Sequence, residues 1–289
     1  RRNVEPGTKT KKEMIVDSHV HFWKYDAVRD TWITDDMSVL RQNFYPKDAQ
    51  VFFSPSKVKA CVAVQADQSE TETNFLIDLS SRHDFIKGVV GWVDFRKDDI
   101  GERLRHYSQF SVVKGFRHIV QSESQDFLLN KTFQSGINLL RAFDFTYDIL
   151  IYHTQLRPAV SFAQKFPDQT FVLDHCAKPN IRNKEINSWK EMLKELAQHP
   201  HMFCKLSGLL TEANWKTWTN DDLKPYIDTV FETFGPGRIM FGSDWPVMML
   251  AGQYVNWIEV VKSYITQYTA QEQENILSRN AATAYRLTL

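Results

Sequence analysis

The sequence predicts a single (β/α)8 TIM barrel, an α/β fold in which eight parallel strands alternate with helices. Short apolar runs rich in Val, Ile and Phe recur along the whole chain, each followed by a polar turn and a longer segment with helical spacing. Eight such runs occur in 289 residues, and barrels of this kind typically have about 250 residues. The chain contains no GxGxxG or GxxxxGK[ST] motif, which the rival doubly wound open sheet would place after an early strand.

The predicted elements follow one another as strand and helix. The expected strands cover residues 14–19, 59–65, 86–93, 112–118, 147–153, 170–175, 202–208 and 238–244. Helical spacing predicts helices over residues 72–83, 132–144, 188–199, 223–235 and 270–287. No shift in composition and no Gly/Ser linker interrupts the series, so we expect residues 13–289 to form one domain. Residues 1–12 are basic and turn-rich, and we expect them to form a disordered arm.

The charge balance and the cysteines narrow the range of functions. The chain has 35 Lys and Arg residues against 35 Asp and Glu residues, so no net charge favours a nucleic acid or a membrane surface. No stretch approaches the ~18 consecutive apolar residues of a membrane-spanning helix. The three cysteines lack CxxC spacing and lie in or beside apolar runs, as reduced thiols of a cytoplasmic enzyme do. We therefore expect a cytoplasmic protein with a small-molecule ligand, and the sequence leaves a homo-oligomer open.

Polar residues gather at the carboxyl ends of the expected strands. His19 and His21 are two residues apart, so they share one face of the first strand. A barrel brings all its strand ends to one mouth. The other polar residues at strand ends are Gln65, Asp94, Arg117, His118, His153, His175, Lys205, Ser207 and Asp244. A lone buried histidine is usually only a hydrogen-bonded core residue, but four histidines and an aspartate at strand ends together indicate a functional site.

Four side chains are candidates for binding a substrate at this mouth. Arg117 offers a planar cation that suits a carbonyl, a carboxylate or a pair of hydroxyls, although a structural salt bridge under the loops is the alternative. His118 is its neighbour in the chain. Trp32 lies in the long, aromatic-rich connection 22–56, and Trp245 directly follows Asp244. Either indole could cover the apolar face of a sugar or pack in a small core of its own.

The chain resembles a known superfamily through several motifs. An HxH pair after the first strand, histidines after the fifth and sixth and an aspartate after the eighth resemble the amidohydrolase superfamily. These residues are His19, His21, His153, His175 and Asp244. The stretches GFRHIVQ, FVLDHCAKP, KLSGL and RIMFGSDWPV resemble its sugar-acid lactonase branch, the relatives of L-fuconolactonase and L-rhamnonolactonase. The resemblance spans roughly residues 14–287 and implies a metal-dependent hydrolase with a TIM-barrel fold.

The resemblance also implies a site for at most one metal ion. Superfamily members with two metals carry a bridging Lys or Glu at the end of strand four, where this chain has Arg117 and His118. Members of the lactonase branch carry one divalent ion, or none that catalysis requires. We therefore expect a mononuclear site with zinc as the first candidate. Its expected ligands are His19, His21, His175 and Asp244.

The resemblance implies a hydrolase that opens a sugar-acid lactone such as L-fucono- or L-rhamnono-lactone. Lactone hydrolysis needs a base for water, a polarised carbonyl and a proton for the leaving alkoxide. Asp244 is the expected general base, with His153 and His175 as further catalytic residues. Two alternatives remain: a metal-dependent decarboxylase of the same superfamily, and a barrel that binds a sugar acid without catalysis.

Overall fold

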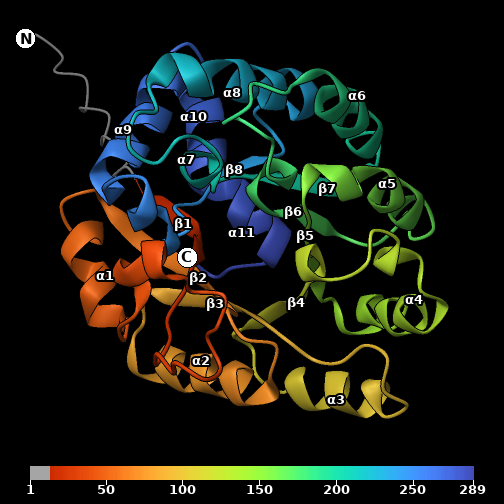
Figure 1. Ribbon diagram of the computed structural model, residues 1–289. Helices are drawn as coiled ribbons and strands as arrows, with labels where there is room; N and C mark the ends of the chain where they lie inside the picture. The colour runs from red at the N-terminus through yellow and green to blue at the C-terminus, as the bar shows by residue number, and fades with distance from the viewer. Residues whose placement is uncertain (1–13) are drawn as a thin grey trace, which may run out of the picture.

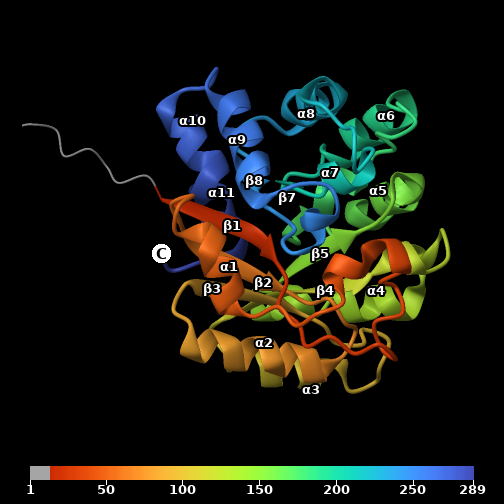
Figure 2. The same ribbon diagram turned by 60° about the vertical axis from the view of Figure 1, so that its left-hand side comes forward.

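The computed structural model describes residues 14–289, which form one eight-stranded parallel barrel surrounded by helices (Figure 1 and Figure 2). The strands neighbour one another in sequence order, from the first to the eighth. The predicted (β/α)8 fold is therefore confirmed. The disordered arm expected over residues 1–12 lies outside the described residues.

The secondary structure alternates as expected. The strands are β1 Ile15–Val20, β2 Val58–Val64, β3 Ile86–Gly91, β4 Val113–Ile119, β5 Thr146–Leu150, β6 Phe171–Leu173, β7 Met202–Leu206 and β8 Ile239–Phe241. The α-helices are α1 Pro46–Phe53, α2 Glu70–Arg82, α3 Ile100–Tyr107, α4 Lys131–Ile137, α5 Leu156–Gln164, α6 Asn187–Leu196, α7 Leu209–Glu212, α8 Asn220–Phe234, α9 Tyr254–Ile265, α10 Ala270–Glu274 and α11 Asn280–Tyr285. Shorter helical turns are η1 Asp35–Leu40, η2 Val120–Ser122, η3 Phe127–Leu129, η4 Leu140–Phe143, η5 His153–Gln155, η6 Asp174–Ala177, η7 Val247–Leu250 and the π-helical η8 Asn275–Arg279. None of the helices within residues 14–289 is both long and apolar enough to cross a membrane.

Two apolar cores hold the barrel together. The larger core lies between the strands and the surrounding helices, because parallel strands covered on both faces bury nearly every residue. The smaller core fills the barrel interior, where strand residues such as Val62 and Val172 pack with Ala281 and Tyr285. α11 lies across the centre of the ring of strands in Figure 1. A hydrogen bond joins the end of α11 to Thr146, the first residue of β5. Thr146 Oγ1 donates to a carbonyl of α11 at 2.8 Å. The helix therefore closes the amino-terminal end of the barrel.

The barrel closes between β1 and the segment after β8. The backbone N–H of Asp244 donates to the carbonyl of His19 at 2.9 Å, and the N–H of His21 donates to the carbonyl of Trp245 at 2.8 Å. Ser18 Oγ also donates to a carbonyl of β8 at 2.7 Å. These bonds place the carboxyl ends of the first and eighth strands side by side.

Six of the strands, β2, β3 and β5 to β8, end one to three residues earlier than the sequence predicts, and two of them lead directly into the candidate site. β6 ends at Leu173 and β8 ends at Phe241. After each of them the chain enters left-handed backbone conformations, with φ 52° at His175 and φ 62° at Asp244. A residue in this region cannot continue a strand. The side chains expected at these two strand ends therefore project from turns and not from the sheet.

Candidate active site

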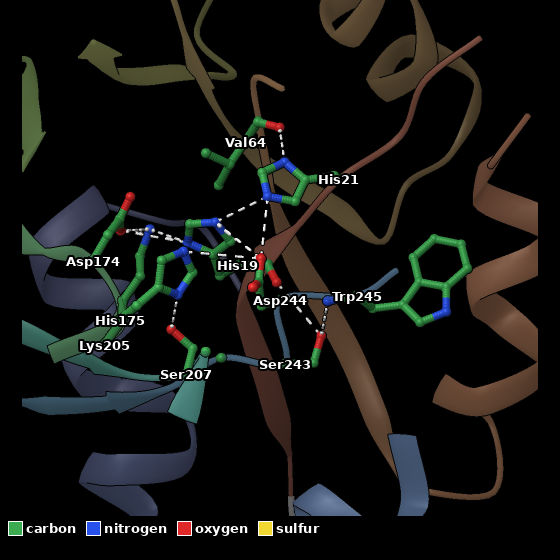
Figure 3. A network of polar contacts seen from close by, with 12 residues as sticks. His19, His21, Val64, Asp174, His175, Lys205, Ser207, Ser243, Asp244 and Trp245 are labelled. Carbon is green, nitrogen blue, oxygen red and sulfur yellow. Dashed lines mark hydrogen bonds and ion pairs between the residues drawn. The ribbon is translucent and has the colours of Figure 1, made fainter. Parts of the chain in front are cut away.

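Three histidines and one aspartate meet at the carboxyl ends of the strands (Figure 3). We call His19, His21, His175 and Asp244 the His/Asp cluster. His19 Nε2 lies 3.2 Å from His21 Nε2. Asp244 Oδ1 lies 3.3 Å from His21 Nε2, 3.8 Å from His19 Nε2 and 3.9 Å from His175 Nε2. No side chain of the cluster is more than 5% exposed. The structure thus brings together four of the five histidine and aspartate residues that mark the strand ends.

A left-handed turn holds His175. Four consecutive residues from His175 to Lys178 have φ of 52°, 54°, 60° and 48°, and none of them is glycine. A non-glycine residue in this left-handed conformation raises the free energy of the folded chain by roughly 1–2 kcal/mol. Backbone strain of this size is found most often at functional sites. The turn directs the His175 ring toward Asp244 in Figure 3. The strained backbone is therefore independent support for a functional site here.

Gly208 leaves room for the ring of His175. It has φ 68°, and a Cβ at this position would lie 2.7 Å from both Cγ and Nδ1 of His175. The preceding residue, Ser207, places its Oγ 2.9 Å from His175 Nδ1. The segment after β7 therefore both accommodates and orients this imidazole.

The other two imidazoles are also oriented by contacts of Nδ1. His21 Nδ1 donates to the carbonyl of Val64 at 2.8 Å, so its Nε2 presents a lone pair to the cluster. His19 Nδ1 lies 3.1 Å from Lys205 Nζ and 3.4 Å from Asp174 Oδ1. All three histidines thus turn Nε2 toward Asp244.

A buried ion network lies beside the cluster, inside the barrel. Lys205 Nζ donates to Asp148 Oδ2 at 2.6 Å and lies 3.0 Å from Asp174 Oδ1. Arg117 Nη1 donates to Asp174 Oδ2 at 2.9 Å and lies 3.2 Å from His19 Nε2. None of the four charged side chains is more than 3% exposed. Two cations against two carboxylates balance the charge that burial would otherwise penalise, and the network fixes the position of His19.

Burial and neighbouring groups set the charge of the cluster. Burial alone would raise the pKa of Asp244, but the adjacent His175, His21 and His19 outweigh it and hold that pKa below its usual range. Burial lowers the pKa of His175 to about 4, although Asp244 and Asp174 oppose this. Burial and then the charge of Lys205 lower the pKa of His19. At neutral pH the cluster thus contains the Asp244 carboxylate beside the neutral imidazoles of His175 and His19.

The cluster fits one divalent metal ion. Two sets of residues bring three ligand atoms within 4.8 Å of one another: His19, His21 and Asp244, and His19, Asp174 and His175. Tetrahedral zinc with bonds of about 2.0–2.1 Å places its ligand atoms roughly 3.3 Å apart. The separations of 3.2 Å and 3.3 Å around His21 Nε2 match this spacing. His21 in particular has its Nδ1 hydrogen-bonded outside the cluster, as metal-binding histidines usually do.

His153 does not join the cluster. It begins the turn η5 after β5 and is half-buried. Its Nδ1 donates to the carbonyl of Lys178 at 2.9 Å, so it contacts the end of the left-handed turn and not its histidine. The hydrogen bond joins His153 to the turn that carries His175, and its role as a catalytic residue stays a prediction.

The four expected substrate-binding residues lie in different surroundings. Arg117 belongs to the ion network beside His19. His118 accepts a hydrogen bond from Trp92 Nε1 at 3.2 Å and stacks on Phe127 with ring centroids 4.7 Å apart. Successive residues of a strand point to opposite sides, so His118 faces away from Arg117 and from the cluster. The expectation that both residues face the mouth is therefore corrected.

The two tryptophans also differ. Trp245 is 1% exposed and packs edge-on against Phe44 at 5.3 Å, so it belongs to a buried aromatic group and not to a pocket wall. Trp32 is 42% exposed and stands edge-on to Trp23 at 6.0 Å. The ring of Trp23 lies 6.3 Å from that of His21. Trp32 is thus the tryptophan with an accessible ring on the cluster side of the first loop.

The sequence analysis did not single out Asp148 or Asp174. A signal was present for each, because Asp148 interrupts the apolar run YDILIY and Asp174 precedes His175 in FVLDHC. A charged residue inside a strand that is buried on both faces needs a partner of opposite charge. Lys205 in the buried strand β7 is that partner.

The fold and the cluster together define a class of enzyme. The chain belongs to the amidohydrolase family, since the model of that family (Amidohydro_2) matches residues 16–287. The chain is 35% identical over 284 residues to L-fucono-1,5-lactonase of Burkholderia multivorans, covering 94% of this chain and 96% of that protein. It is 30% identical to L-fucono-1,5-lactonase of Burkholderia ambifaria, covering 94% and 95%. It is 26% identical to L-rhamnono-gamma-lactonase of Scheffersomyces stipitis, covering 64% and 62%.

Solved structures agree with this assignment. An amidohydrolase from Burkholderia multivorans with bound zinc superimposes with a TM-score of 0.92 at 34% identity, covering 96% of this chain and 100% of that one. A putative 2-pyrone-4,6-dicarboxylic acid hydrolase from Pseudomonas putida has a TM-score of 0.75 at 15% identity, covering 95% and 98%. The second likeness shows the shared fold alone.

Proposed function

We propose that the protein is a lactonase that hydrolyses the cyclic ester of a sugar acid, with L-fucono-1,5-lactone as the first substrate to test. The observation that carries this proposal is the Asp244 carboxylate at the barrel mouth, whose Oδ1 lies 3.3 Å from His21 Nε2, 3.8 Å from His19 Nε2 and 3.9 Å from His175 Nε2. Two relatives named L-fucono-1,5-lactonase match 94% of the chain at 35% and 30% identity and support the substrate class.

The proposed reaction uses the cluster to move one proton. A water oxygen attacks the lactone carbonyl carbon, the ring C–O bond breaks, and the ring oxygen leaves as a hydroxyl group. Asp244 accepts the proton of the attacking water, as a positioned general base does. His175, with Nε2 3.9 Å from Asp244 Oδ1, passes a proton toward the ring oxygen. His153 acts with it on the leaving-group side of the mouth.

The proposed binding residues stabilise charge and cover the sugar. Arg117 Nη1, 3.2 Å from His19 Nε2, supplies positive charge where the carbonyl oxygen becomes negative. Trp32 presents an exposed ring to the apolar face of the substrate. His118 and Trp245 are packed among aromatic rings away from the cluster, so we leave them out of the proposed binding site.

We further propose that His19, His21 and Asp244 hold one divalent ion, with zinc as the first candidate and the fourth position left for water, so that His175 Nε2 stays free to carry the proton. Such an ion, when bound, polarises a carbonyl and lowers the pKa of water toward about 7. The spacing of the ligand atoms and the zinc-bound relative support this assignment. A cytoplasmic location is also proposed, supported by three free cysteines that are all buried.

A hydrolysis screen tests the proposed function. The purified protein is mixed with L- and D-series aldonolactones in weakly buffered pH indicator, with and without a chelator. Acid release above the spontaneous rate on at least one aldonolactone is expected, together with loss of the rate in a matched Asp244→Asn sample. Release of CO2 from aromatic or unsaturated acids, without lactone hydrolysis, would instead identify a decarboxylase.

A further inference from the structure

A lysine and a glutamate lie beside His153, outside the His/Asp cluster. Lys178 ends the left-handed turn and gives its carbonyl to His153 Nδ1. Its Nζ lies 3.7 Å from Glu212 Oε1. Glu212 ends α7, and its own carbonyl accepts the N–H of Arg182 at 3.0 Å. The segments that follow β5, β6 and β7 therefore bring His153, Lys178 and Glu212 together, and we call these three residues the rim group.

The rim group has hydrogen-bonding capacity that the protein does not use. At 3.7 Å the ion pair between Lys178 and Glu212 is longer than a hydrogen bond. Within residues 14–289, the Glu212 carboxylate and the Lys178 ammonium have each other as ion-pair partners, the ammonium also lies over the Tyr152 ring, and His153 uses only Nδ1. Yet the side chains of Lys178 and Glu212 are only 16% and 21% exposed. One long ion pair uses only part of the three donors of an ammonium and the several acceptor sites of a carboxylate, so both groups can also bind a polar ligand.

The rim group is close to the His/Asp cluster. Lys178 is three residues from His175 in the same turn. Burial raises the pKa of Glu212; Lys178 and His153 lower it, and the charge of Asp244 raises it further, so both the cluster and His153 act on this carboxyl. The rim group and the His/Asp cluster lie on segments that follow neighbouring strands of the barrel, so they share one mouth.

The opposite side of the mouth is aromatic. In the order of eight strands, β5 and β6 lie across the ring from β1 and β2, as Figure 1 shows. The segment after β1 carries Trp23 and the exposed Trp32. The mouth thus has an apolar side and a side with unused donors and acceptors. A ring with hydroxyl groups along one edge matches both sides.

We propose that Lys178 and Glu212 form the subsite that recognises hydroxyl groups of the substrate ring. The ammonium donates to a hydroxyl oxygen while the carboxylate accepts from a neighbouring hydroxyl, which suits a vicinal pair. The assignment rests on the proposed lactonase function and names the residues that select a polyhydroxylated lactone over a plain one. Tyr152, whose ring centroid lies 5.6 Å from Lys178 Nζ, helps to hold the ammonium in place.

Two six-membered lactones test the subsite. L-fucono-1,5-lactone carries ring hydroxyls, and δ-valerolactone has the same ester ring without them. We expect Glu212→Gln and Lys178→Met to raise KM for L-fucono-1,5-lactone by about 10- to 100-fold, as the loss of a charged hydrogen bond predicts. Their KM for δ-valerolactone should change by less than about 2-fold. The matched control is Glu232→Gln, because Glu232 pairs with Lys190 at 2.9 Å between the outer helices α6 and α8; it should leave both KM values unchanged.

The outcomes separate the two proposals. If the wild type hydrolyses L-fucono-1,5-lactone and both rim variants behave like Glu232→Gln, the hydroxyl subsite is refuted and the lactonase stands. If the variants lose both lactones equally, Lys178 and Glu212 support the site as a whole and do not select hydroxyls, which also refutes the subsite. If the wild type hydrolyses no aldonolactone of the screen, both proposals fall. Circular dichroism and thermal unfolding of each variant verify the fold, and Glu212→Gln, which keeps the side-chain shape, serves alone if Lys178→Met does not fold.

Discussion

Replacing Gly208 with alanine should displace His175 and lower turnover without unfolding the protein. The added Cβ would lie 2.7 Å from Cγ and Nδ1 of His175, whereas ordinary contact begins at 3.4 Å. The ring must therefore retreat by about 0.7 Å, and a misplacement of about 1 Å can cost roughly 100-fold in rate. We expect kcat on the best lactone to fall by about 10- to 100-fold. The left-handed backbone adds a stability cost of roughly 1–2 kcal/mol.

Gly235 supplies the control that separates strain from displacement. It has φ 66°, nearly the same as the 68° of Gly208, but a Cβ there would meet nothing within 4 Å. Its ψ of 165°, against 0° at Gly208, places Gly235 in a region that is essentially restricted to glycine. Gly235→Ala should thus lose at least as much stability as Gly208→Ala in urea unfolding and still keep wild-type kinetics. The reasoning is refuted if Gly208→Ala retains the wild-type kcat, or if Gly235→Ala loses as much activity as Gly208→Ala.

Two further predictions concern buried charges. Lys205→Met leaves Asp148 and Asp174 with Arg117 as their only cation in this network, and it should lower the free energy of unfolding in urea by about 3–5 kcal/mol. The surface variant Lys190→Met is the control and should lower it by less than about 1 kcal/mol. Equal losses of stability in the two variants would contradict the importance of the buried network. Burial raises the pKa of the Glu72 carboxyl to about 7 from an ordinary 4.5, so the folded state binds the carboxyl proton more tightly than the unfolded state does. The free energy of unfolding should therefore fall by roughly 3 kcal/mol as pH rises from about 4.5 to 7. Glu72→Gln should flatten that pH dependence, and an unchanged slope would rule out Glu72 as its source.

The sequence was sufficient for the barrel because its signals are local and repeated. Apolar runs separated by helical segments fix the order of strands, and the order of strands brings their ends to one mouth. His19 and His21 could be placed on one face because side chains alternate along a strand. Their Nε2 atoms indeed lie 3.2 Å apart. Alternation applied to Arg117 and His118 also shows that only one of them can face the cluster.

The rest of the site depends on backbone that local propensity does not predict. Four non-glycine residues from His175 to Lys178 in left-handed conformation are disfavoured at every position. Only the surrounding structure stabilises them, and local propensity does not predict that this turn brings the carbonyl of Lys178 to His153. The pairing of Lys205 with Asp148 and Asp174 likewise joins three strands distant in sequence, and a single sequence gives no register between such strands.

The most direct measurement of the central claim compares wild-type protein and Asp244→Asn on the best aldonolactone of the screen, with binding of the product acid followed by calorimetry. The asparagine keeps the shape of the side chain and removes the proton acceptor. The account predicts that kcat falls by about 100-fold or more, while the affinity for the product acid changes much less. An Asp244→Asn enzyme with near wild-type kcat would contradict it, because the barrel mouth would then have no identified base.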